Sequence, residues 1–96
     1  MNIELNANEG LGKIIVDAAR DNGFELYFNY SGRGMFGKKC FGITGNLSDI
    51  GSFFIDACMS CSEEEIYDLS DCFTSVQWDS LGIDKIFYFP RLLITE

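Results

Sequence analysis

Large apolar side chains occupy every second position from Phe24 to Tyr30, and this alternation constrains the fold more than any other feature of the sequence. Successive side chains of a strand point in opposite directions, so the pattern predicts a β-strand. The glycine-rich residues 32–37 follow it, and residues 39–44 are the predicted hairpin partner. Gly42 weakens this second strand or marks a bulge within it.

Helix starts are indicated by a polar residue followed three positions later by an acidic one, the pattern of a capping box. It occurs at Asn6 with Glu9, at Asn46 with Asp49 and at Ser62 with Glu65. Apolar residues recur at helical spacing after each of these positions. We therefore predict a helix over residues 8–21, a second helix after Asn46 and a short third helix after Ser62.

The remaining segments resemble strands, at residues 3–5, 76–78 and 86–89, with residues 92–95 as an extension of the last one beyond Pro90. A turn is expected at residues 79–82. The order β-α-β-β-α-α-β-β predicts an α+β fold over residues 1–96 as a single domain. We expect a mainly antiparallel sheet of four to five strands with two to three helices on one face.

The formal net charge is −8, from fifteen acidic and seven basic side chains, and no Lys or Arg occurs between Cys40 and Asp84. Direct binding of nucleic acid would need a basic face, so we expect none. No apolar run is long enough to cross a bilayer, and the first ten residues do not resemble a signal peptide. We therefore expect a cytoplasmic protein without a membrane partner, its cysteines reduced.

Catalytic motifs are scarce. The chain has no histidine, which excludes Ser-His-Asp and Cys-His sites, and we expect no enzyme activity, catalytic residue or cofactor. Residues 32–37, G-R-G-M-F-G, satisfy G-x-G-x-x-G, but a strand is predicted after them where a dinucleotide fold needs a helix. A Walker P-loop is absent, and the further motifs of a protein kinase are missing.

Two interpretations of this loop stay open. The first is a hairpin connection whose glycines relieve backbone strain. The second is a contact with a phosphate, a small ligand or a partner. The residues that would make this contact are Arg33, Met35, Phe36, Lys38 and Lys39.

Cys58 and Cys61 form a C-x-x-C motif, the spacing of redox dithiols and of half of many zinc sites. Both fall on the apolar stripe of the second predicted helix, where a cysteine usually behaves as a small buried hydrophobic residue. We therefore interpret them as structural thiols and predict no metal site, with zinc and redox roles as the alternatives.

Acidic residues on the predicted helices are the main candidates for a partner contact. Glu64, Asp68 and Asp71, at i, i+4 and i+7, share one helical face, and we call these three residues the acidic row. Asp49 and Asp56 on the second helix complete the predicted set. Hydration can stabilise such a row, but it can also attract a basic groove as a phosphate backbone would.

Residues 30–43, Y-S-G-R-G-M-F-G-K-K-C-F-G-I, together with the short acidic chain, resemble small proteins carried by bacteriophages and prophages. The resemblance implies an inhibitor of a host defence system, such as an anti-CRISPR or anti-restriction protein. Its partner would be a host protein with a basic nucleic-acid-binding groove, for example a CRISPR effector. The protein would bind this partner in the host cytoplasm, as a monomer or a homodimer. The alternative is a small phosphate- or ligand-binding module that uses residues 32–37.

Overall fold

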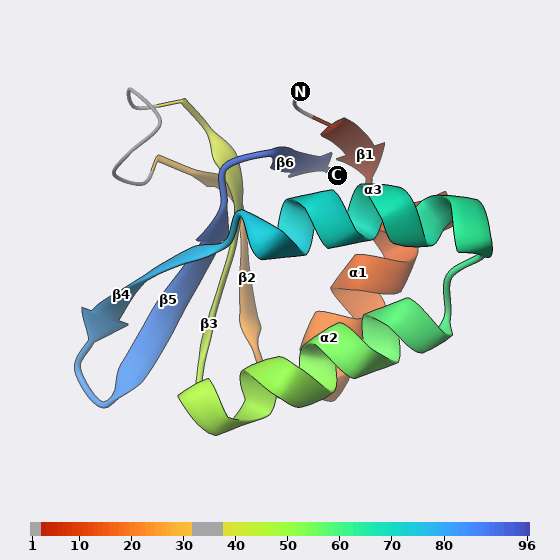
Figure 1. Cartoon of the computed structure of the whole chain (residues 1–96). Coiled ribbons are helices and arrows are strands. Elements are labelled where there is room, and N and C mark those ends of the chain that lie inside the picture. Colours follow the sequence, from red (N-terminus) through yellow and green to blue (C-terminus); the bar gives the residue numbers. More distant parts are fainter. Residues whose placement is uncertain (1–2, 32–37) are drawn as a thin grey trace.

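The computed structural model describes residues 3–31 and 38–96, and it shows the predicted α+β fold (Figure 1). The elements run in the order β1 (Ile3–Asn6), α1 (Gly10–Asp21), β2 (Glu25–Tyr30), β3 (Cys40–Gly45), the short 3-10 helix η1 (Leu47–Asp49), α2 (Ile50–Met59), α3 (Glu63–Thr74), β4 (Gln77–Leu81), β5 (Asp84–Phe89) and β6 (Leu92–Thr95). The radius of gyration of the Cα atoms is 12.1 Å.

Four strands form an antiparallel sheet in the order β2-β3-β5-β4. Its register pairs Leu26 with Ile43 and Ile43 with Phe87, so these side chains share one face, which carries the core. Glu25 pairs with Thr44 on the opposite face. The register between β2 and β3 shifts by one residue between Tyr27 and Tyr30. The extra residue is in β2, next to the Tyr27–Gly42 pair, so the irregularity expected at Gly42 lies in the partner strand instead.

β1 and β6 form a separate parallel pair, with Ile3 opposite Leu92 and Leu5 opposite Ile94. The expectation that residues 92–95 extend the preceding strand is therefore wrong. Pro90 has no N–H to donate to a strand ladder, and the chain turns at Pro90 and Arg91 before β6 begins. The pairing brings the first and last strands together (Figure 1).

The predicted helix starts have different outcomes. Ser62 and Glu65 form the expected capping box, with Glu65 N donating to Ser62 Oγ over 3.3 Å. Asn46 accepts from Ser48 N but caps η1, which leads into α2. Asn6 accepts from Asn8 N within its own turn, so α1 begins at Gly10 without a side-chain cap.

The expected turn at residues 79–82 lies slightly later, because β4 continues to Leu81 and pairs with Asp84 at the start of β5. The connection uses Gly82, whose φ is +63°, and Ile83. A positive φ is readily adopted only by glycine, which places the turn at Gly82.

An aromatic cluster joins α2 and α3 to one face of the sheet. Phe53 of α2 is fully buried, and its ring lies 5.4 Å from that of Phe73 on α3, 5.9 Å from that of Phe24 and 6.3 Å from that of Phe89 on β5. Ile15 of α1 belongs to the same core. The other sheet face, which bears Glu25 and Thr44, is therefore left without a covering helix.

Candidate functional site

The acidic row lies on α3 with all three side chains exposed, but its members differ in their partners. Asp71 pairs with Arg91, the Oδ1 atom 2.9 Å from the Nη1 atom. Within the described parts of the chain, Glu64 and Asp68 form no ion pair. The uncompensated charge of the row therefore rests on Glu64 and Asp68.

The two acidic residues predicted on the second helix point to other neighbours. Asp56 accepts a hydrogen bond of 2.9 Å from Asn22 Nδ2, at the end of α1. Asp49 ends η1 and lines a polar pocket described below. The five predicted residues are thus divided among α3, the α1–α2 contact and the pocket, and only the α3 members stay together.

An apolar groove separates α2 from α3, with a volume of about 360 Å³. We call it the α2–α3 groove, and it is lined by Phe54, Cys58, Ile66, Ser70, Phe73 and Thr74. The residues that follow two of the lining residues in the sequence are large, apolar and exposed, Met59 after Cys58 at 80% and Tyr67 after Ile66 at 81%. Of the lining residues, Phe54 is partly buried against the core, whereas Ile66 is 40% exposed.

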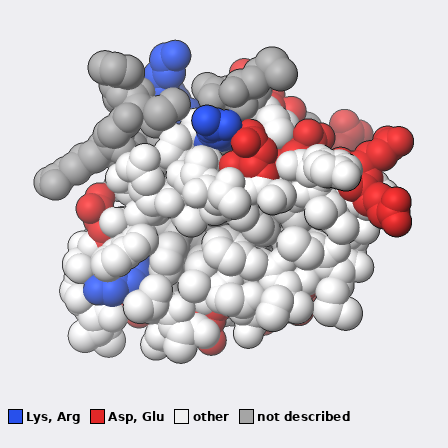
Figure 2. Space-filling model, in the orientation of Figure 1, with Lys and Arg blue, Asp and Glu red and all other residues white. Residues whose placement is uncertain are grey.

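The groove and the acidic row lie on different sides of α3. Ile66 and Phe73 face α2, whereas Asp71 faces Arg91, just before β6. Figure 2 shows the same division, with a mostly uncharged face over α2 and α3 and acidic side chains at the edge where α3 begins. A partner seated over α3 would meet apolar surface on one side and carboxylates on the other.

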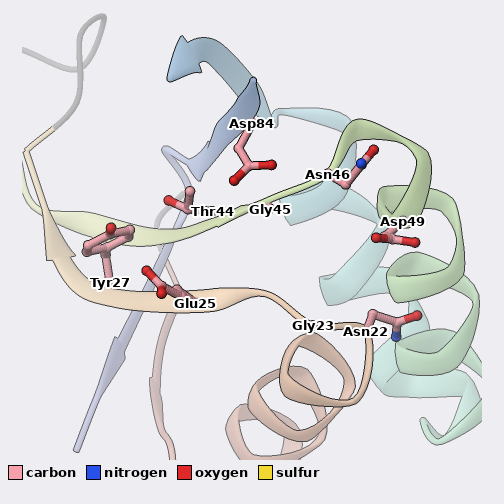
Figure 3. Close-up of a pocket in the computed structure, with 9 residues that line it drawn as sticks. All are labelled: Asn22, Gly23, Glu25, Tyr27, Thr44, Gly45, Asn46, Asp49 and Asp84. Carbon is pink, nitrogen blue, oxygen red and sulfur yellow. The ribbon is translucent and has the colours of Figure 1, made fainter. Parts of the chain in front are cut away.

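A second cavity, of about 480 Å³, lies at the end of the sheet where α1 leads into β2 and β3 leads into η1 (Figure 3). We call it the polar pocket. Its lining is formed by Asn22, Gly23, Glu25, Tyr27, Thr44, Gly45, Asn46, Asp49 and Asp84. It includes three carboxylates and no Lys or Arg.

Thr44 is a buried residue of the polar pocket, and its side-chain hydroxyl lacks a hydrogen bond. The residue is 8% exposed, and its Oγ1 atom has no hydrogen-bond partner among the described residues. A buried hydroxyl without a partner costs about 1–3 kcal/mol. Of this pocket the sequence indicated only Asp49 as a site residue; the polar positions of the residue 24–30 alternation were the signal for Glu25 and Tyr27.

Cys58 of α2 and Cys61 are partly buried and pack against the core. The predicted place on a helical stripe is confirmed for Cys58 and wrong for Cys61, because α2 ends at Met59 and Cys61 lies in the connection to α3. The Cys61 thiol donates to Ala57 O over 3.0 Å. Burial raises the pKa of the Cys61 thiol, and the nearby Glu65 carboxylate raises it further. These surroundings favour the neutral thiol over the nucleophilic thiolate.

Cys72 gives the chain a specific pH dependence. The residue is 2% exposed, and burial, followed by the charge of Asp71, raises the pKa of its thiol to about 11 from an ordinary value of 9.0. The folded state therefore disfavours the thiolate, so this thiol has no effect on stability below pH 9 and destabilises the fold as the pH rises. Denaturant unfolding should show about 2 kcal/mol lost through this group by pH 11.

Cys72→Ala supplies the control, because it removes the thiol and should flatten the loss of stability between pH 9 and pH 11 relative to the wild type. Tyr and Lys side chains also titrate in this range, so the difference between the two proteins is the quantity to compare. Equal slopes in the two proteins would show that the Cys72 thiol does not contribute.

Residues Arg33, Met35 and Phe36 of the glycine-rich loop lie outside the described residues. Lys38 and Lys39 are described, and both are exposed in the segment leading into β3. The sequence-based interpretations of this loop therefore remain predictions.

Within residues 3–31 and 38–96, no three His, Cys, Asp or Glu side chains are grouped as a metal site. The same part of the chain contains no helix that is both long and apolar enough to span a bilayer. Comparison of the chain with protein-family models, with curated proteins and with solved structures gives no match.

Proposed function

We propose that the chain is an interaction protein that binds a basic, nucleic-acid-binding surface of a partner protein through α3. The observation that carries the proposal is the exposed pair Glu64 and Asp68, which has no ion-pair partner in the described parts of the chain. The resemblance of residues 30–43 to bacteriophage proteins makes a host defence protein, such as a CRISPR effector, the partner that we favour. Binding would then block access of nucleic acid.

Charge complementarity is the first part of the argument. Like charges at helical spacing destabilise a helix by a few tenths of a kcal/mol per pair, and a basic groove would relieve this repulsion between Glu64 and Asp68. Glu63 adds a third exposed carboxylate at the start of α3. Arg91 already compensates Asp71, so the contribution of Asp71 to binding should be smaller.

Apolar contact is the second part of the argument. Charge complementarity raises the association rate and the selectivity of binding more than it raises the affinity. Tyr67 is 81% exposed on α3, and aromatic side chains of this kind are common energetic centres of protein interfaces. The α2–α3 groove beside it offers Phe54 and Ile66 to an apolar side chain of the partner. The proposed interface therefore combines an apolar centre with an acidic border.

The test is the double substitution Glu64→Gln and Asp68→Asn. Both residues are exposed, so the melting temperature should change little. The affinity for a partner captured from host lysate should fall by about tenfold or more, mainly through slower association, and added salt should weaken the wild-type complex. Double-stranded DNA should compete with the wild-type protein for the partner.

A matched control is Glu9→Gln with Asp21→Asn, which removes the same charge from two exposed carboxylates at the ends of α1 that form no ion pair in the described parts of the chain. The control should bind the captured partner like the wild type. If the partner binds the α3 double variant as tightly as the wild type, the proposal is wrong. Residues Arg33, Lys38 and Lys39 would then become the leading candidates for the contact.

A further inference from the structure

The polar pocket has the composition of a site for a positively charged group. Glu25, Asp49 and Asp84 reach it from three different segments, β2, η1 and the start of β5 (Figure 3). No lining residue is basic, so an anionic ligand would be repelled. A volume of about 480 Å³ lies in the range of small-molecule sites in proteins.

Thr44 supplies a second observation, independent of charge. Its hydroxyl is buried without a hydrogen-bond partner among the described residues, and Thr44 lies in the pocket wall. The sheet register places Thr44 directly opposite Glu25, and its other partner, Ile86, is two residues from Asp84. Side chains two residues apart on a strand share a face, so Glu25, Thr44 and Asp84 belong to the same side of the sheet, as Figure 3 shows.

The arrangement favours an organic cation over a metal ion. The described residues contain no group of three carboxylate, thiol or imidazole side chains placed to hold a metal. A primary ammonium carries three N–H donors and a guanidinium carries five, so one such group can bridge acceptors that come from separate segments. The half-exposed ring of Tyr27 can add a cation–π contact at the pocket wall.

We propose that the polar pocket binds a primary ammonium or guanidinium group, with Glu25 and Asp84 as its counter-charges and the Thr44 hydroxyl as a further hydrogen-bond acceptor. The Thr44 oxygen is covered in the present structure, so its contact with the ligand, as part of this proposal, requires a change of the χ1 rotamer of Thr44 and displacement of the exposed Glu25 side chain. The group belongs either to a free polyamine or to a Lys or Arg side chain. The proposal does not depend on the function proposed for α3.

Calorimetric titration at 150 mM NaCl tests it with two kinds of probe. Spermidine represents the free amine, and the blocked tripeptides Gly-Lys-Gly and Gly-Arg-Gly represent side chains. We expect at least one probe to bind with a Kd below about 1 mM. Binding of spermidine alone would identify a free amine as the ligand, and binding of the peptides alone would identify a side chain. A Kd above about 1 mM for every probe would overturn the proposal.

Charge-matched variants locate the site. Glu25→Gln and Asp84→Asn should each lower the affinity for the probe by about fivefold or more. Glu64→Gln, which removes the same charge from α3, should lower the affinity by less than about twofold. If the Glu64 and Glu25 variants weaken binding equally, the probe only screens the net charge of −8 and the pocket is not a site.

Thr44→Val separates a ligand contact from a structural role. Valine has a similar shape and lacks the unpartnered hydroxyl, so the variant should melt at the same or a higher temperature than the wild type. It should nevertheless bind the probe more weakly. Unchanged affinity in this variant would remove Thr44 from the proposed site, and unchanged affinity in Glu25→Gln as well would overturn the site itself.

Discussion

Gly12→Ala is expected to destabilise the fold by about 3 kcal/mol or more, although alanine is normally the better residue inside a helix. Gly12 is buried in α1 where that helix crosses the end of β1. A Cβ atom at this position would collide with the carbonyl oxygen of Asn6 and would lie only 2.7 Å from the Asn6 carbonyl carbon. Both obstacles are backbone atoms, so no side-chain rotation relieves the clash, and α1 would have to move away from β1.

The measurement is thermal unfolding, in which a loss of this size should lower the melting temperature by about 10–20 °C in a domain of this length. Gly51→Ala is the matched control, because Gly51 is an exposed helical glycine of α2, and a Cβ atom added there would have no neighbouring atom within 4 Å. It should stabilise the protein by about 0.5–1 kcal/mol. A Gly12 variant as stable as the wild type would mean that α1 and β1 are packed less closely than described.

The Gly12 contact also shows which parts of this fold the sequence can predict. Elements whose signals are local were predicted well, namely the alternating strand that became β2 and the Ser62–Glu65 capping box that begins α3. Both depend on residues within seven positions of one another. A glycine required by the close approach of α1 and β1 has no such local signature, because it is the neighbouring backbone that leaves no room for a side chain.

For the same reason, local sequence patterns could not predict that the first and last strands pair. Ile3 lies opposite Leu92 in a parallel pair, although almost the whole sequence separates them. The pattern of residues 92–95 correctly predicts a strand, but apolar alternation does not identify the strand with which it pairs.

The candidate sites divide in the same way. Helical spacing correctly placed Glu64, Asp68 and Asp71 on one face of α3, which is a property of the helix alone. It could not show that Arg91 compensates Asp71 or that Asn22 holds Asp56, because both partners come from other elements. The polar pocket is the extreme case, since its three carboxylates come from three segments of the chain.

Phe53→Ala is expected to cost about 3–5 kcal/mol, a large part of the roughly 5–15 kcal/mol that stabilises a typical domain. Phe53 is fully buried, and its ring contacts the rings of Phe24, Phe54, Phe73 and Phe89. These rings come from α2, α3, β5 and the residue before β2, so removing the central ring leaves a cavity where the helices meet the sheet. The neighbouring residues are held by other contacts and can fill this cavity only in part.

Urea unfolding provides the measurement, with a lower midpoint expected for Phe53→Ala and a slope close to that of the wild type, because the two folded states expose similar surface. Ile55→Ala is the control on the same helix. Ile55 is 60% exposed, so its truncation should change the free energy of unfolding by less than about 0.5 kcal/mol. If the two variants unfold at the same urea concentration, Phe53 is not the centre of the core, and the packing of α2 against the sheet differs from the one described.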